Sequence, residues 1–218
     1  MPRERNELTR QSNIKNAEKI FILAFEGTYA EFQYYEAIKE KAKYQEDIIY
    51  IVNLERTKEQ KNNSAPKYVF DLLKKTKQDY KLKATDEFWM IIDRDRWKLD
   101  EWREKCEKEK NFFIALSNPC FEFWLLLHIK DITDFSDVEL QKMYENKKVS
   151  KKKNYLEKVL KDVLAMSGGY RKDSIKPERF LAHLEKAVRQ AKVLDSSDIY
   201  NNLGSHNYLL IKKLFSAK

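Results

Sequence analysis

The sequence predicts an α/β fold in which a parallel sheet of four strands is flanked by helices and followed by a helical C-terminal part. Within the first 130 residues, short apolar runs alternate with segments of helical periodicity, a pattern that favours a parallel sheet. Only four Gly and four Pro occur in 218 residues, which indicates long regular elements and few elaborate loops. The four predicted strands are IFILAF at 20–25, IIYIVNL at 48–54, EFWMIID at 87–93 and FFIAL at 112–116.

Helices are expected between and after these strands. Apolar residues recur at helical spacing after Ala30 and again over 65–82, and residues 99–109 predict a charged helix. After the fourth strand, SNP at 117–119 predicts a helix cap with Pro at the first helical position. The stretch FEFWLLLHI that follows is apolar nearly all round, so we expect it to form a buried helix.

The C-terminal part shows helical periodicity only. Apolar residues recur every three or four positions over 155–166, 177–194 and 207–215. We therefore divide the chain into three parts, which are an N-terminal arm over 1–18, a catalytic core over 19–130, and a helical part over 131–218 that packs on the core.

The composition predicts a cytoplasmic protein without a membrane anchor. The N-terminal segment is charged and lacks the apolar stretch of a secretory signal, and no apolar run is long enough to span a bilayer. The two cysteines, Cys106 and Cys120, lack metal-ligand spacing and indicate a reducing compartment. The net charge of +8 is consistent either with a nucleic-acid partner or with an ordinary Lys-rich surface.

Acidic residues follow the predicted strands at the edge where ligands of parallel sheets bind. Glu26 follows the first strand, Asp93 and Asp95 end the third, and Glu122 lies in the first turn of the helix after the fourth. Such residues at strand ends and helix starts also have an ordinary structural explanation. Together, however, they supply the oxygen ligands that Mg²⁺ prefers, so we predict a magnesium site, with Mn²⁺ as an alternative.

Basic residues near these acids are candidates for contacts with phosphate. Arg94 and Arg96 either bind phosphates or pair with the neighbouring aspartates. Lys172, after a Gly-Gly turn, either stabilises charge on a scissile phosphate or is a solvated loop lysine. The lysine run at 147–153 either binds a phosphate backbone or forms a solvated loop, and its members are Lys147, Lys148, Lys151, Lys152 and Lys153.

Three segments together resemble the RloB-like family. FILAFEGTYAEFQYY at 21–35 resembles its Glu-Gly-x-x-Thr-Glu signature, with Ala30 in place of Thr, and IIDRDRW at 91–97 resembles its Asp-x-Asp strand. ALSNPCFEFWLLLH at 115–128 resembles a long and specific block of the family. The C-terminal NNLGSHNYLLIKKL at 201–214 resembles the last family motif loosely, because its Pro and Thr are absent.

The resemblance implies a Toprim-like fold and a metal-dependent nuclease. It implies that Glu26 is the catalytic acid or base and faces the metal, that Asp93 and Asp95 are ligands, and that Glu31, Asn118 and Glu122 complete the site. RloB-like proteins are associated with bacterial restriction and abortive-infection loci and are often paired with an ATPase. Related Toprim effectors cleave nucleic acid, including transfer RNA, so the expected substrate is RNA in preference to DNA.

Two other functions stay open at this stage. A non-cleaving Toprim-like subunit would bind an ATPase partner or nucleic acid. With either function, a homodimer is a candidate assembly. A primase would use the same metal site, but the zinc-binding or helicase-docking segments expected of a primase are not visible. The sequence contains no P-loop, so the chain is not itself an ATPase of that class.

Overall fold

The computed structural model describes residues 17–42, 49–54, 65–79, 82–94, 97, 99–151, 153–195 and 198–215. Most of the predicted N-terminal arm and three predicted site residues, Asp95, Arg96 and Lys152, lie outside the described residues.

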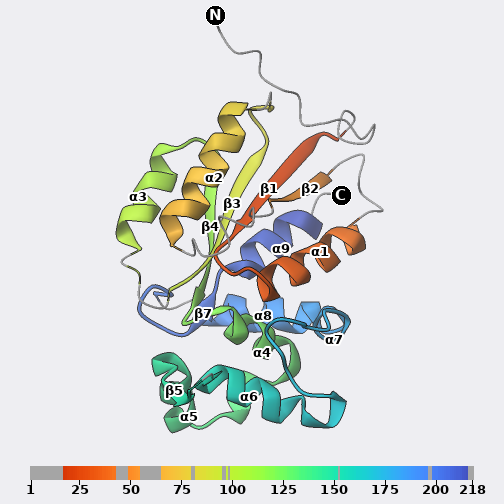
Figure 1. Ribbon diagram of the computed structural model, residues 1–218, viewed down its shortest axis with the longest axis vertical. Helices are drawn as coiled ribbons and strands as arrows, with labels where there is room; N and C mark the ends of the chain where they lie inside the picture. The colour runs from red at the N-terminus through yellow and green to blue at the C-terminus, as the bar shows by residue number, and fades with distance from the viewer. Residues whose placement is uncertain are drawn as a thin grey trace, which may run out of the picture.

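The described chain forms a mostly parallel sheet with the strand order β2-β1-β3-β4-β7 (Figure 1). The predicted α/β class is confirmed, and the first four strands run parallel as expected. The fifth strand is only two residues long and runs antiparallel to β4, so it carried no recognisable sequence pattern. The strands are β1 (Lys19–Phe25), β2 (Ile49–Leu54), β3 (Glu87–Asp93), β4 (Phe112–Asn118) and β7 (Gly204–Ser205).

Helices cover both faces of this sheet, which explains why its strands are continuously apolar. The helices α2 (Pro66–Asp79) and α3 (Asp100–Lys108) lie on one face, and α1 (Ala30–Ala42) and α9 (Asn207–Phe215) lie on the other (Figure 1). Alternate residues of β1 enter separate cores. Phe21, Leu23 and Phe25 pack on the α1 and α9 side, and Ile20, Ile22 and Ala24 pack on the α2 and α3 side.

The helices from α4 to α8 lie beyond one end of the sheet, whereas α9, which belongs to the same predicted helical part, covers a face of the sheet (Figure 1). At the centre of α4 to α8 is α4 (Phe121–Ile129), which is buried over nearly its whole length, as its apolar sequence predicts. This helix packs against α6 and α8. The remaining elements are α5 (Asp137–Glu145), the hairpin β5 (Lys148–Ser150) and β6 (Lys153–Asn154), α6 (Tyr155–Val163), α7 (Glu178–Leu181), α8 (Leu184–Leu194) and the 3₁₀ turns at Ile132–Asp134 and Ala165–Ser167.

Two local predictions were wrong. The helix after β4 begins at Phe121 with Cys120 as its N-cap, because Ser117 and Asn118 are still part of the strand and Pro119 precedes the helix. The helix predicted over 177–194 is divided into α7 and α8, because the backbone leaves the helical region at His183 (φ −119°, ψ 26°).

Two further elements, α5 and the β5–β6 hairpin, were not predicted from the sequence. The start of α5 did carry a signal, because Ser136 and Glu139 form a reciprocal capping box there.

Candidate functional site

The carboxyl ends of β1, β3 and β4 are neighbours, so the polar residues that follow these strands converge at one edge of the sheet. The register of β3 and β4 places Asp93 opposite Ser117. The amide of Glu26 donates to the Ile91 carbonyl at 2.9 Å, which continues the pairing of β1 with β3 beyond the end of β1. Strand order therefore brings Glu26 next to Asp93.

The Glu26 carboxylate accepts two hydrogen bonds at this edge. Its Oε2 accepts from the Asp93 backbone amide at 3.0 Å, and its Oε1 accepts from the Trp97 indole at 2.7 Å. Trp97 was not among the predicted site residues, although it lies only two positions after the Asp-x-Asp segment. These two donors fix the orientation of Glu26 beside the end of β3.

Glu31 lies in the first turn of α1 and is 2% exposed. Its carboxylate packs directly against the turn after β1, because a Cβ placed on Gly27 would lie 1.9 Å from Glu31 Oε2. The glycine of the Glu-Gly pair is therefore required for a close approach between the turn and this carboxylate. The start of a helix also favours a negative charge at this position.

Glu122, in the first turn of α4, is 1% exposed and is held by a loop of the helical part. The Tyr170 hydroxyl donates to Glu122 Oε1 at 3.0 Å, and Lys172 Nζ lies 3.0 Å from the same oxygen. Burial alone would raise the pKa of Glu122, but the Lys172 ammonium and the hydrogen bonds outweigh burial and lower it. Tyr170 was not predicted, and it lies 48 residues from Glu122 in the sequence.

Asp93 is surrounded by other acids. Burial is the largest cause that raises its pKa, and the charges of Glu31, Glu26 and Glu122 add to this effect. Lys172 acts in the opposite direction but does not outweigh them, so the pKa of Asp93 lies well above its usual range. The residue itself is partly exposed, so the acidic cluster is open to solvent or a ligand at Asp93.

A further acid, Glu157 in the first turn of α6, faces the same cluster. Burial raises its pKa first, and the negative charge of Glu122 raises it further. Glu157 was not predicted as a site residue, because its proximity to Glu122 depends on how α6 packs against α4.

Behind the acidic cluster lies a buried polar network. The Asn207 side chain accepts from the Tyr35 hydroxyl at 2.6 Å and donates to the hydroxyls of Ser117 and Ser205, each at 2.8 Å. Asn118 is buried, and its amide donates to the Ile199 carbonyl at 2.8 Å. Asn118 thus supports the turn before β7, and Asn207 connects α1, β4 and β7.

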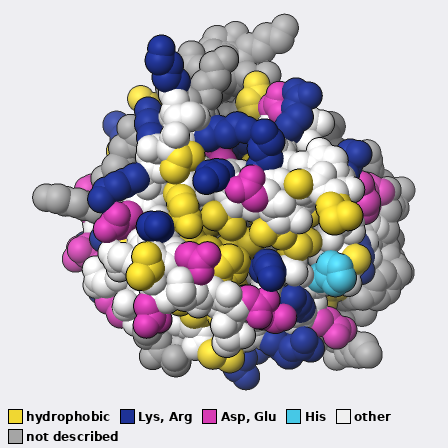
Figure 2. All heavy atoms as spheres, turned by 90° about the horizontal axis from the view of Figure 1, so that it is seen from below, with side chains coloured by type: hydrophobic (Ala, Val, Ile, Leu, Met, Phe, Trp, Pro, Cys, Tyr) yellow, Lys and Arg dark blue, Asp and Glu magenta, His cyan; other side chains and the backbone are white. Residues whose placement is uncertain are grey.

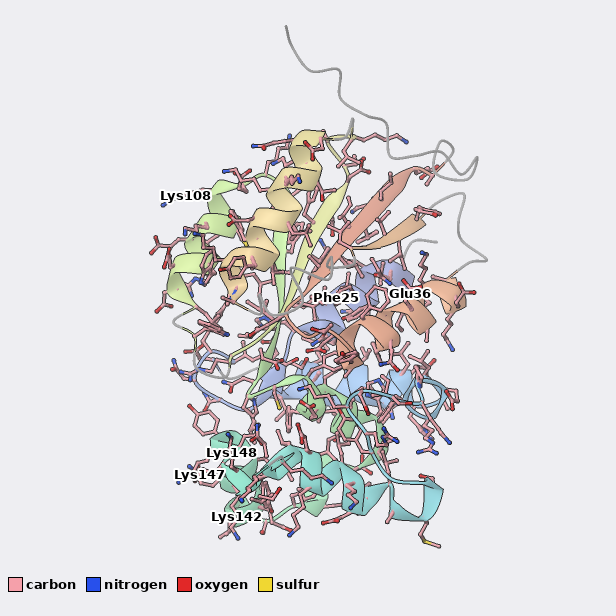
Figure 3. All side chains as sticks on the ribbon, in the orientation of Figure 1. Phe25, Glu36, Lys108, Lys142, Lys147 and Lys148 are labelled. Carbon is pink, nitrogen blue, oxygen red and sulfur yellow. The ribbon has the colours of Figure 1, made fainter. Side chains whose placement is uncertain are left out.

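The basic residues are divided between two places. The Arg94 guanidinium is turned inward, where its Nε donates to the Tyr200 carbonyl at 2.7 Å. Lys147, Lys148 and Lys151 are exposed, and Lys153 is partly exposed. These four lysines lie on or beside the β5–β6 hairpin. Lys147 and Lys148 lie well below Lys108 of α3 in the view of Figure 3. The face seen from below carries Lys and Arg side chains around a central hydrophobic strip (Figure 2).

Within the described part of the chain, no group of three or more His, Cys, Asp or Glu side chains is arranged to hold a metal ion. Glu26 and Asp93 are adjacent, but Asp95 lies outside the described residues. His128 has a structural role, since its ring bonds the Tyr34 hydroxyl at 3.0 Å and the Trp124 carbonyl at 2.9 Å. Cys106 and Cys120 are free and buried.

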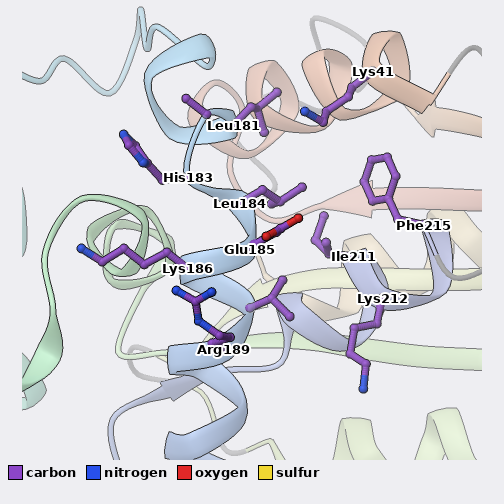
Figure 4. A pocket seen from close by; sticks show the side chains of 12 residues that line it. Lys41, Leu181, His183, Leu184, Glu185, Lys186, Arg189, Ile211, Lys212 and Phe215 are labelled. Carbon is purple, nitrogen blue, oxygen red and sulfur yellow. The ribbon is translucent and has the colours of Figure 1, made fainter.

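A groove of about 730 Å³ lies away from the acidic cluster, where α8 approaches α9 and the last turn of α1 (Figure 4). Its apolar lining includes Leu184, Val188 and Phe215. Basic residues also line this groove, and these are Lys41, Lys186, Arg189 and Lys212.

The model of a family described as RloB-like protein matches residues 21–214. No curated protein and no solved structure matches the chain. Among the described helices, none has the length and apolar character needed to cross a bilayer.

Proposed function

The chain belongs to the RloB-like protein family, and on that premise we propose that it is a magnesium-dependent nuclease. Its substrate is a nucleic-acid phosphodiester, RNA in preference to DNA, with transfer RNA as the preferred class. Its role is antiphage defence in bacteria. The observation that supports this proposal is the set of acids at the carboxyl end of the sheet, where Glu26 and Asp93 are adjacent and Glu31 and Glu122 lie close enough to raise the pKa of Asp93.

The chemistry of these side chains fits a hard divalent cation. They are carboxylates, and Mg²⁺ is usually bound by one or two carboxylates together with water and substrate phosphate. Glu26 and Asp93 would hold the ion with Asp95, whereas the Glu122 carboxylate is already paired with the Lys172 ammonium. Bound there, Mg²⁺ or Mn²⁺ would stabilise negative charge on the phosphoryl oxygens and lower the pKa of an attacking water.

The protein's own groups supply the remaining functions. Glu26 serves as the general acid or base, and the Trp97 indole and the Asp93 amide fix the direction of its carboxylate. Lys172, whose ammonium lies within the acidic cluster, stabilises charge on the scissile phosphate. The lysines of the β5–β6 hairpin bind the nucleic-acid backbone through charge, without reading its sequence.

The test is cleavage of total RNA and of plasmid DNA by the purified full chain, with Mg²⁺ or with chelator. We expect cleavage of RNA that chelation abolishes and that Glu26→Ala removes. Cleavage that persists in chelator, or that is equal in Glu26→Ala, contradicts the proposal. The matched control is Glu36→Ala, because Glu36 lies on the same helix as Glu31 but accepts from the Asn53 amide at 2.7 Å, away from the cluster.

A second candidate function is a subunit that docks on a partner protein such as an ATPase. The groove between α8 and α9 favours it, because an apolar floor with a basic rim suits an amphipathic segment that carries acidic residues. Complete absence of cleavage by the purified chain, together with pull-down of a co-expressed ATPase that Val188→Asp abolishes, would support this function over the first.

A further inference from the structure

The Glu122 carboxylate is occupied by donors from the protein itself. Tyr170 Oη and Lys172 Nζ both lie 3.0 Å from Oε1. A carboxylate offers about four acceptor positions, two on each oxygen, so these two donors fill the positions on Oε1. The Lys172 ammonium also compensates the negative charge of Glu122, so this carboxylate does not require a bound cation.

Glu122 and Tyr170 are buried, whereas the Lys172 side chain is partly exposed and can contact a ligand. Glu122 is 1% exposed and Tyr170 is 7% exposed, whereas the Lys172 side chain is 44% exposed. A buried carboxylate needs a compensating charge and hydrogen bonds, and the two loop residues supply them. Because the lysine stays partly open, its ammonium can contact a ligand while it remains paired with Glu122.

The Lys172 ammonium also faces the proposed metal-binding acids. The charges of Glu31 and Asp93, after that of Glu122, favour its protonated form. A phosphodiester bound at Glu26 and Asp93 would therefore meet a fixed positive charge on the Lys172 side of the cluster.

The loop that carries both residues has a defined shape. Gly168 and Gly169 lie in the left-handed region, with φ of 94° and 70°, and the Arg179 guanidinium donates to the Gly169 carbonyl at 3.2 Å. Tyr170 follows immediately, so the turn directs its hydroxyl toward α4 and Lys172 comes two residues later.

We propose that Tyr170 is a positioning residue for Lys172, and that Glu122 is the anchor carboxylate of this pair and not a ligand of the metal. The ligand of the positioned ammonium is a non-bridging oxygen of a phosphodiester. This inference rests on the proposed function, because the phosphodiester is its substrate.

The experiment compares Tyr170→Phe with Tyr155→Phe, which removes a hydroxyl from the start of α6 where the ring packs on the same core. Three quantities are measured in each protein: Mn²⁺ affinity by electron paramagnetic resonance, kcat for RNA cleavage, and melting temperature. We expect Tyr170→Phe to lower kcat about tenfold, as for a lost hydrogen bond to a charged group. The Mn²⁺ affinity and the melting temperature should match those of Tyr155→Phe.

A double-mutant cycle then tests whether Tyr170 acts through Lys172. Lys172→Gln keeps a donor for Glu122 but removes the charge. In that background Tyr170→Phe should change kcat by less than about twofold, because coupled residues are non-additive. Equal losses in both backgrounds, a Tyr170→Phe enzyme indistinguishable from Tyr155→Phe, or a clear loss of Mn²⁺ affinity would overturn the inference.

A binding measurement separates this inference from the proposed function. If the wild-type chain cleaves nothing, the proposed function fails, and binding of a fluorescent single-stranded RNA of 20 nucleotides in Ca²⁺ decides the inference. Equal weakening of binding by Tyr170→Phe and Lys172→Gln supports the positioning role. Binding that neither variant changes, or no binding by the wild type, overturns it.

Discussion

The two ends of the sheet both contain buried acids, but they satisfy these acids differently. At the amino end, Asp86 accepts from the Ile20 and Lys83 amides at 2.9 and 2.7 Å. Glu87 pairs with Lys19 at 2.6 Å and Lys213 at 2.8 Å and accepts from the Trp89 indole. Burial alone would raise the pKa of Glu87, but these partners lower it.

At the carboxyl end the pKa of Asp93 is shifted in the opposite direction to that of Glu87. Burial and the acids Glu31, Glu26 and Glu122 raise its pKa despite Lys172. The cations beside Glu87 favour its charged form, whereas the acids beside Asp93 disfavour its charged form and would favour an added cation there. The comparison indicates a structural role for the amino end and a ligand-binding role for the carboxyl end.

The largest expected effect is that substitution of an acid lowers the rate of cleavage at the carboxyl end and lowers stability at the amino end. Glu26→Gln should lower the rate of cleavage by roughly 10²–10⁴-fold, as for a lost general acid or base, with little change in stability. Glu87→Gln should keep the rate and lower the free energy of unfolding by about 2 kcal/mol, because two partly exposed lysines lose their partner. Kinetics and urea denaturation of both variants measure this, and a Glu87→Gln enzyme that is stable but inactive would break the comparison.

His128, which is fully buried in α4, provides a pH-dependent test of the protein interior. Burial lowers the pKa of His128 to about 3. In the unfolded chain His128 is protonated below about pH 6.5, whereas in the folded chain it stays neutral down to about pH 3. The free energy of unfolding therefore carries no penalty from His128 above pH 6.5 and decreases as the pH falls toward 3. By pH 4 the loss from this group is about 3 kcal/mol.

The measurement for His128 is urea denaturation at several pH values. His128→Gln should have a shallower dependence on pH between 6.5 and 4, by up to one proton, even if it is less stable at pH 7. Parallel curves for the two proteins would show that His128 is not the group responsible.

Gly27→Ala should disturb the carboxyl end without altering any acid. The new Cβ would lie 1.9 Å from Glu31 Oε2, so the Glu31 carboxylate must move. We expect activity to fall about tenfold or more and stability to fall by about 1–3 kcal/mol. Glu31→Ala in the same chain should restore stability but not activity, and recovery of both would mean that Glu31 only fills space.

The smallest effect is expected at the hairpin, whose lysines act together. Ala at Lys147, Lys148 and Lys151 should weaken RNA binding by about tenfold at low salt and reduce the salt slope by about 2. The control removes three exposed lysines elsewhere, Lys67, Lys75 and Lys108. The comparison is made by fluorescence anisotropy across a salt series. Equal effects of the two triple variants would mean that RNA binding depends on the overall charge of the protein and not on the hairpin.

The sequence predicted those parts of the site that depend on neighbours in the chain. Glu26 directly follows one apolar strand and Asp93 ends another, and parallel pairing of the two strands brings them together. Tyr170 and Glu157 could not be found this way, because their contacts depend on how a loop and α6 pack on α4. The contact of Asn207 with Ser205 could not be predicted either, because Ser205 lies in β7, a strand too short to be recognised from the sequence.

The most direct measurement is titration of Mn²⁺ into three proteins, the wild-type chain, Asp93→Asn and Glu87→Gln, followed by electron paramagnetic resonance. If the carboxyl end is the metal site, the wild type and Glu87→Gln bind Mn²⁺ equally, and Asp93→Asn binds it at least about tenfold more weakly. Equal binding by all three proteins, or a loss confined to Glu87→Gln, would contradict the account.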